Sequence, residues 1–306
     1  MRWAQLGDHL FRTTDERFDL QACDGCGTVF IEPVPTLEQQ AGYYPDDYWL
    51  GPAEGGRPTA PSGLLEAYRR LVLRDHVRFV RRALAAQRAR GMTPTVLDVG
   101  CGDGSFLAAL GEADSCGMDV SLPALRAVRA RGLRAVRGIA TDCPLRPGSF
   151  TLVTAFHFLE HVRAAQTILA AMRDLLAPGG EIVLQVPNIR SWQARLLGRH
   201  WSGLDVPRHL VDYSDRTLIR VLNDAGFEIL ARNHHSLRDN PTLLANSLVP
   251  GLYPPAHRAR SGGARGLVAA CKDFAYLATT LLCTPFSVLE SACGRGASVM
   301  VHARPR

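Results

Sequence analysis

Residues 96–104, VLDVGCGDG, constrain the fold of this chain more than any other stretch. Val96 to Val99 are predicted to form a short buried strand, and glycines alternate behind it at positions 100, 102 and 104. A helical run begins at Ser105. A strand, a glycine-rich turn and a helix in this order bring the backbone close to a small ligand in an α/β sheet.

Two details of this stretch narrow the choice of ligand. The glycine spacing is G-x-G-x-G, and Asp98 lies inside the strand end. A dinucleotide pyrophosphate needs free N–H groups at a helix start and no nearby carboxylate, so an NAD-linked oxidoreductase is disfavoured. The carboxylate instead favours a zwitterionic or cationic ligand. The stretch closely resembles motif I of class I S-adenosylmethionine (SAM) methyltransferases, which implies SAM as the cofactor.

Predicted strands and helices alternate from residue 95 onwards. This alternation predicts an α/β fold with a mainly parallel, doubly wound, Rossmann-like sheet. The resemblance implies seven strands, with the last one antiparallel. The predicted strands cover 96–99, 116–120, 133–137, 150–156, 181–186, 228–232 and 297–303.

Asp119 ends the second predicted strand, 21 positions after Asp98. This spacing fits an acidic side chain that accepts the ribose hydroxyls of a nucleoside. Ile139 and Thr151 stand where the family commonly has acids, so adenine is expected to be held by backbone groups and apolar packing. The residues predicted to bind the cofactor are Asp98, Gly100, Cys101, Gly102, Gly104, Asp119, Val120, Ala140 and Phe156.

The chain is predicted to have five segments. Residues 1–50 form an N-terminal arm, and 51–92 hold a Gly- and Pro-rich linker and an amphipathic helix. The SAM-binding core covers 93–235, a helical insertion or lid covers 236–296, and 297–306 supply the final core strand.

The arm contains a C-x-x-C-G knuckle at Cys23 and Cys26. Such a pair presents two thiolates to a tetrahedral zinc ion, but a full site needs two more ligands. No second C-x-x-C exists, and His9 is the other local ligand. A zinc site, an incomplete knuckle and a start codon placed too late all stay open. The arm resembles the zinc-ribbon-like arm of certain bacterial small-molecule methyltransferases, and Tyr43, Tyr44, Tyr48 and Trp49 either line a substrate mouth or pack the arm.

Residues 157–161, HFLEH, follow the fourth predicted strand. The bare pattern H-x-x-E-H is that of inverted zinc proteases. That motif needs a continuous helix and a third ligand downstream, whereas this stretch lies at a strand end in a Rossmann-like sheet, so a protease is disfavoured. In the related quinone O-methyltransferases the pattern is E-x-x-E-H and can hold a divalent metal. Two imidazoles and one carboxylate suit Mg²⁺ poorly, so Glu160 and His161 are expected to cap a helix and shape the pocket floor.

The segment 201–214 resembles the W-x-x-L-D-x-P-x-H-x-x-x-[FY]-S signature of the family, which implies a loop over the active-site end of the sheet. His209 is the first choice for a general base because imidazole titrates near neutral pH. The alternative is a structural histidine that holds the loop. His161 and His157 are the other catalytic candidates.

The basic charge of the chain is spread thinly. A net charge of +6 without basic clusters does not indicate a nucleic-acid partner. The N-terminal stretch lacks an apolar signal-peptide region, which predicts a cytoplasmic location with reduced thiols. The small-molecule acceptor and the oligomeric state cannot be predicted from these patterns.

The insertion contains an uncharged apolar run at 274–286 and a basic loop at 258–266. The run falls short of the ~20 apolar residues that span a bilayer and contains Pro285. We expect a helix pair that lids the pocket, while the neighbouring basic loop keeps open a peripheral membrane contact through 266–293.

These features together predict a SAM-dependent methyltransferase. The methyl group is expected to move to an oxygen or carbon of a small molecule, such as a sugar, a quinone or a natural-product intermediate. The alternative is a non-catalytic SAM-binding protein with a regulatory or assembly role, because Ile139 and Thr151 depart from the family pattern.

Overall fold

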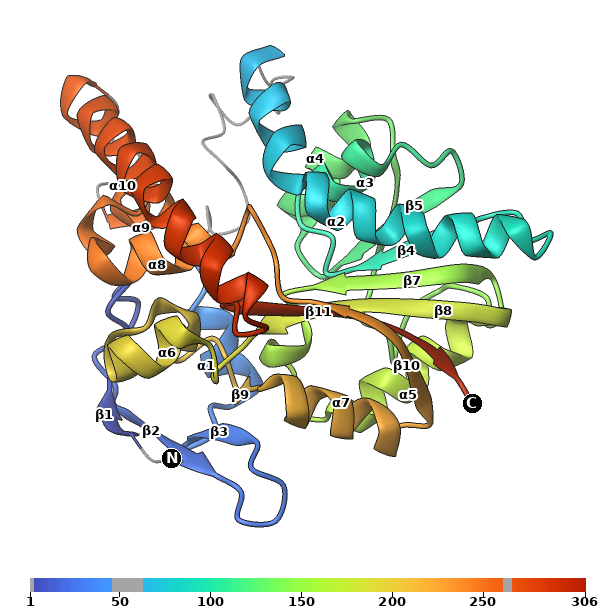
Figure 1. Cartoon of the computed structure of the whole chain (residues 1–306), viewed down its shortest axis with the longest axis horizontal. Coiled ribbons are helices and arrows are strands. Elements are labelled where there is room, and N and C mark those ends of the chain that lie inside the picture. The colour runs from blue at the N-terminus through green and yellow to red at the C-terminus, as the bar shows by residue number, and fades with distance from the viewer. Residues whose placement is uncertain (1–2, 46–62, 261–265) are drawn as a thin grey trace.

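The computed structural model describes residues 3–45, 63–260 and 266–306. Its larger sheet has seven strands in the order β10-β11-β8-β7-β4-β5-β6 (Figure 1). Strand β11 runs antiparallel to both neighbours and the other pairs are parallel, so the predicted Rossmann-like α/β fold is confirmed. The strands are β4 (Val96–Val99), β5 (Ser115–Asp119), β6 (Arg134–Arg137), β7 (Phe150–Phe156), β8 (Leu176–Pro187), β10 (Phe227–Asn233) and β11 (Ser298–Pro305).

Helices cover both faces of this sheet because successive strand residues point to opposite sides. Val96 packs in a cluster with α2 (Gly63–Ala89) and α3 (Ser105–Leu110). Leu97 packs in the opposite cluster with α5 (Ala165–Leu175) and α7 (Asp215–Asp224). Helix α4 (Leu122–Ala130) packs beside β5 and β6. The helix predicted over 64–90 corresponds to α2, and the predicted linker lies almost wholly outside the described residues.

The N-terminal arm forms a second, smaller sheet in the order β1-β2-β3-β9. Its strands β1 (Trp3–Leu6), β2 (Phe18–Ala22) and β3 (Val29–Glu32) come from the arm. The fourth strand, β9 (Val211–Asp212), comes from the segment between β8 and α7 and pairs with β3. The arm thus shares a sheet and an apolar cluster with the loop that carries His209.

The insertion between β10 and β11 is helical. It contains α8 (Asn240–Leu248), the short 3₁₀ turn η4 (Pro250–Leu252), the short helix α9 (Pro254–Arg260) and the long helix α10 (Leu267–Ala292). The predicted helix pair over the apolar run is wrong in one respect, because α10 continues through Pro285 as one helix. Pro285 lies inside this helix at an exposed position.

Candidate active site

The glycine-rich turn after β4 uses backbone conformations that favour glycine. Gly100, Gly102 and Gly104 have φ values of 70°, 52° and 75°. A Cβ at Gly100 would lie 2.9 Å from the Phe158 ring, whereas one at Gly102 would meet no atom of the described residues within 4 Å. The turn at Gly102 therefore leaves space for a ligand to approach bare backbone.

Asp119 ends β5 with its carboxylate against this turn. Oδ2 accepts the N–H of Gly102 at 3.0 Å, and Oδ1 accepts the N–H of Ser121 at 2.9 Å. Each oxygen keeps a further lone pair that can accept a ribose hydroxyl. Val120 follows Asp119 in the chain and is 58% exposed, and Ile139 is 43% exposed. These residues fit a nucleoside, with a carboxylate for the hydroxyls and apolar surface for the ring.

Asp98 is buried at the end of β4 and makes an internal hydrogen bond. The Thr154 hydroxyl of β7 donates to its Oδ1 at 2.7 Å. Burial raises the pKa of Asp98 to about 7, because a charged carboxylate loses hydration there. A cationic ligand group beside it would favour the ionised form, which is consistent with the predicted ammonium partner.

Three other predicted cofactor residues use their side chains for packing. Cys101 belongs to an apolar cluster with α4, and Ala140 lies in the main core. The Phe156 ring packs edge-on against Phe106, with centroids 4.6 Å apart. Any role of Cys101 in cofactor binding therefore falls to its backbone.

The segment 157–161 follows the carboxyl end of β7. Because β4 and β7 are parallel neighbours with Asp98 opposite Thr154, it lies at the same end of the sheet as the glycine-rich turn. It contains the short turn η1 (Leu159–His161). Phe158, just before this turn, packs against Gly100, so the segment contacts the glycine-rich turn directly.

His157 has a φ of 54°, which non-glycine residues seldom adopt. Its Nδ1 lies 3.1 Å from Glu160 Oε1 and its Nε2 lies 3.4 Å from Asp239 Oδ2. Burial alone would lower the pKa of His157, but the two carboxylates raise it to about 9. His157 is therefore protonated at neutral pH and is a poor general base.

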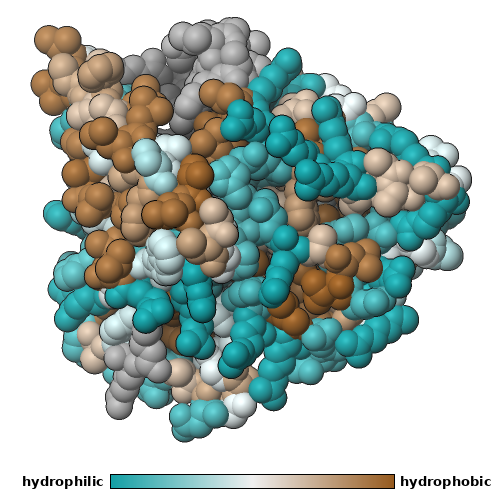
Figure 2. All heavy atoms as spheres, viewed as in Figure 1, coloured by the Kyte–Doolittle hydropathy of each residue, from teal (hydrophilic) through white to brown (hydrophobic). Residues whose placement is uncertain are grey.

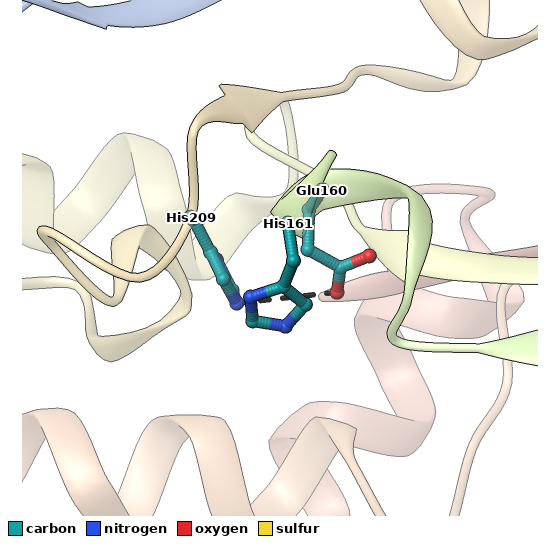
Figure 3. A group of neighbouring side chains, drawn as sticks. All are labelled: Glu160, His161 and His209. Atoms are coloured by element: carbon teal, nitrogen blue, oxygen red, sulfur yellow. Dashed lines mark ion pairs between the residues drawn. The ribbon is translucent and has the colours of Figure 1, made fainter. Parts of the chain in front are cut away.

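Glu160, His161 and His209 converge at this edge (Figure 3). One ligand atom from each lies within 4.8 Å of the others. The rings of His161 and His209 pack edge-on with centroids 4.7 Å apart. His161 Nδ1 lies 2.9 Å from the Tyr44 hydroxyl, so the arm reaches the cluster.

His209 has a fixed tautomer. Its Nδ1 lies 3.0 Å from the Gly203 carbonyl oxygen, which can only accept, so Nδ1 carries the proton. Its Nε2 lies 3.9 Å from Glu160 Oε1 and 4.0 Å from Asp205 Oδ2, beyond hydrogen-bond length. Burial, with the nearby His161, lowers the pKa of His209 to about 4. At neutral pH the Nε2 lone pair is available to a hydroxyl proton.

Glu160 is buried, and its Oε2 makes no hydrogen bond with the described residues. Burial raises the pKa of Glu160, but hydrogen bonding and attraction from His157 outweigh it and hold that pKa below its usual range. The site therefore presents an ionised carboxylate with spare acceptor capacity beside the lone pair of His209.

The quinone O-methyltransferase pattern implies a divalent metal, but these residues suit Mg²⁺ poorly. Mg²⁺ requires octahedral oxygen ligands, but this cluster offers one carboxylate and two imidazoles. The position of the first glutamate is taken by His157, which faces Glu160 and Asp239 instead. Glu160, His161 and His209 are therefore considered through their own hydrogen-bonding and proton-transfer chemistry.

A buried arginine that no sequence pattern indicated joins the arm to this loop. The Arg208 side chain is fully buried and donates to both carboxylate oxygens of Asp8, at 2.8 and 2.9 Å, and to Asp205 at 2.7 Å. It also lies 4.5 Å from the centroid of the Phe11 ring. Asp205 belongs to the recognised signature, but no local pattern indicates that Asp8, 200 positions from Arg208, pairs with it.

Asp239 was also missed. It lies just before α8 and accepts from Ser236 Oγ at 2.6 Å and from Gln185 Nε2 at 2.8 Å. Its ion pair with His157 connects the insertion to the site, and its Oδ2 also lies 3.2 Å from Nε2 of His76 of α2. The only sequence signal was an acidic residue before an Asn-Pro helix start.

The predicted zinc site at Cys23 and Cys26 gains no support. Among residues 3–45, 63–260 and 266–306, the cluster in Figure 3 is the only group of three metal-ligating side chains close enough to share an ion. His9 instead lies within electrostatic reach of Asp8 and Asp205. The two cysteines are free thiols without a third ligand among these residues. Tyr48 and Trp49 lie outside the described residues.

A family model described as a methyltransferase domain matches residues 65–232, more than half of the chain. The chain belongs to this methyltransferase family. The predicted membership of the class I SAM-dependent methyltransferases is thereby confirmed, and family and fold both support SAM as the cofactor.

Curated relatives of this methyltransferase include two ubiquinone biosynthesis O-methyltransferases. The protein of Idiomarina loihiensis is 30% identical over 45% of this chain and 63% of its own length. That of Ralstonia nicotianae is 31% identical over 43% of this chain and 59% of its own length. The chain thus spans less than two thirds of the length of these relatives.

Solved structures with similar folds are more distant in sequence. A putative sarcosine dimethylglycine methyltransferase from Galdieria sulphuraria is 11% identical, with a TM-score of 0.49 and coverage of 75% of this chain and 85% of its own. A possible histamine N-methyltransferase from Thermotoga maritima is 15% identical, with a TM-score of 0.45 and coverage of 77% and 99%.

Proposed function

We propose that this methyltransferase transfers the methyl group of SAM to a hydroxyl oxygen of a small aromatic acceptor. The observation that carries the proposal is the pairing of His209 Nε2 with the Glu160 carboxylate, 3.9 Å apart, at the edge that holds the glycine-rich turn. Two acceptors at this separation suit a catechol, whose two hydroxyls can donate one to each, and a phenol can donate its single hydroxyl to His209. The name of the O-methyltransferase relatives supports a quinone-type acceptor over a sugar.

The chain provides three functions for this reaction. The turn at Gly102 and the carboxylate of Asp119 bind and orient SAM, which supplies an activated methyl group on its sulfonium. Glu160 accepts a hydrogen bond from the acceptor and fixes its orientation. His209 Nε2 takes the hydroxyl proton as the oxygen–methyl bond forms and the sulfur–methyl bond breaks, leaving S-adenosylhomocysteine.

His157 positions this pair and does not take the proton. It is held between Glu160 and Asp239, and it keeps the Glu160 carboxylate ionised and directed at the cluster. His161 contacts both Tyr44 and the ring of His209, so it links the arm to the base.

The proposal is tested with SAM labelled in its methyl group and a panel of catechols, phenols, sugars and carbon acids. We expect label in a catechol or phenol ether, and far slower labelling when His209 is replaced by asparagine. A chain that binds SAM and S-adenosylhomocysteine but labels no acceptor would favour the alternative of a non-catalytic SAM-binding protein. Label on carbon or on a sugar would contradict the proposed acceptor class.

A further inference from the structure

Helix α10 shows a reversed distribution of polar and apolar side chains. Its buried residues are Thr280, Cys283, Ser287 and Glu290. These positions are three to four apart and form one stripe, which faces the rest of the chain. The exposed side is apolar, with exposed fractions of 82% at Leu267, 74% at Phe274 and 81% at Leu282. In an ordinary surface helix this arrangement is the other way round.

The apolar surface runs along the whole helix. Its further members are Val268, Leu277, Leu281, Val288 and Leu289. Figure 2 shows brown side chains gathered on the side of the molecule where Figure 1 places α10. Only 11% of the most apolar 18-residue stretch of α10 is buried, although the helix is long and apolar enough to cross a membrane. A monomeric protein in water rarely leaves a patch of this kind uncovered.

Neighbouring elements extend this surface. Leu248 ends α8, which packs against α10, and is exposed. Leu196 lies in α6 (Trp192–Leu197), whose Trp192 ring lies 6.3 Å from that of Phe286.

The charges on α6, α8, α9 and α10 are mostly positive. These four helices contain four cationic side chains, Arg195, Arg258, Arg260 and Lys272, and two carboxylates, Asp273 and Glu290. Glu290 is fully buried against Gln193, and Asp273 is paired with Arg258. Since Asp273 neutralises Arg258, the charges that remain beside the exposed apolar surface are those of Arg195, Arg260 and Lys272.

We propose that α10, together with the exposed ends of α6 and α8, docks on the surface of an anionic lipid bilayer. An apolar face inserts among the acyl chains while flanking Arg and Lys side chains meet anionic headgroups. A second copy fits less well, because a two-fold contact would oppose the same cations without carboxylates to pair with them. The C-terminal half of α10 is held to the core by its buried stripe. The helix is therefore proposed to lie along the bilayer surface and not to cross the bilayer.

This docking surface lies close to the candidate active site. The N–H of Ser202 donates to Ser247 Oγ of α8, and Ser202 Oγ donates to the Leu243 carbonyl, both at 2.8 Å. Ser202 belongs to the loop that carries His209. Helix α8 therefore lies between the docked bilayer and the loop that carries His209. This short distance suits an acceptor that is dissolved in the membrane.

The test is vesicle flotation of the full chain, which needs no activity. We expect binding to vesicles of phosphatidylcholine mixed with phosphatidylglycerol, and weaker binding to phosphatidylcholine alone or at high salt. The double variant Leu281→Glu, Leu282→Glu should bind about tenfold or more weakly, because charges replace two exposed leucines that would insert into the bilayer. Leu37→Glu, at a 75% exposed position in the arm, is the matched control and should bind like the parent.

Several results would overturn the proposal. One is no flotation with either lipid, and another is equal binding by the parent and the double variant. A third is a dimer in light scattering that the double variant splits into monomers, which would show that a second copy covers α10. Circular dichroism and SAM titration check that each variant is folded, so a loss of lipid binding is separable from a loss of structure.

Discussion

The two halves of the candidate active site are built in different ways. The donor half, around Gly100 to Gly104 and Asp119, consists of backbone groups from one strand–turn–helix unit and the next strand end. The acceptor half, around Glu160 and His209, consists of side chains from the arm, the end of β7, the loop after β8 and the insertion. The donor half depends on local conformation, whereas the acceptor half depends on buried charges that meet only in the folded chain.

The largest expected effect is at Arg208, the centre of the charge network that joins the arm to the acceptor half. Replacing Arg208 by methionine leaves Asp8 and Asp205 buried without their partner, so the free energy of unfolding should fall by about 3–5 kcal/mol. Arg216→Met, at an exposed position of α7, should change it by less than about 0.5 kcal/mol. Denaturant unfolding measures both. Equal stabilities would mean that the network does not hold the acceptor half together.

The next effect is on the pH dependence of stability. The folded-state pKa of His157 is raised to about 9 from an ordinary value of 6.5. The folded chain therefore binds this proton more tightly than the unfolded chain does. The resulting stabilisation is full below pH 6.5 and should be lost, to the extent of about 1–3 kcal/mol, as the pH rises through 9.

This pH dependence is measured by unfolding the parent and His157→Gln at pH 6 to 10. The difference between the two proteins should shrink as the pH rises. A constant difference over that range would mean that His157 is not held protonated by Glu160 and Asp239.

A smaller effect is expected in the donor half. Alanine at Gly100 must adopt a left-handed conformation, at a cost of about 1–2 kcal/mol, and also meets the Phe158 ring. Gly111→Ala is a matched control, because it has nearly the same φ of 71° but open space around its Cβ. Both variants should be destabilised, and only Gly100→Ala should weaken SAM binding in calorimetry. Equal SAM affinities of the two variants would show that this turn does not bind the cofactor.

The smallest effect is expected from Mg²⁺. With one carboxylate in the cluster, millimolar Mg²⁺ should change the free energy of unfolding by less than about 0.5 kcal/mol, and chelation with EDTA should leave activity unchanged. Thermal unfolding with and without Mg²⁺ measures the first of these. A clear rise in Tm that disappears in Glu160→Gln would show that the acceptor half does hold this ion.

The same contrast explains what could be predicted from the sequence. The alternation of strands and helices, the glycine-rich turn and the position of Asp119 follow from short-range patterns of apolar residues and glycines, whereas the seven strands with an antiparallel last one were implied by the family resemblance. His209 was found through the family signature. Its tautomer could not be predicted, because it depends on the Gly203 carbonyl and on burial.

The roles of Arg208, Asp239 and α10 could not be predicted for a related reason. Buried ion pairs between residues far apart in the chain leave no periodic signal, as the pairing of Asp8 with Arg208 shows. The apolar run in α10 is visible in the sequence, but the sequence does not show whether its apolar side faces the core or the solvent. An apolar run predicts burial by default, and only the structure shows that the polar stripe at Thr280, Cys283 and Ser287 faces the core.

The most direct test of the account is a single-turnover reaction with methyl-labelled SAM, a catechol acceptor and excess enzyme. The parent should label the acceptor, and His209→Asn should bind SAM with the parent's Kd while transferring the methyl group about 10²–10⁴-fold more slowly. An unchanged transfer rate in His209→Asn, or a parent that binds SAM and never labels the acceptor, would contradict it.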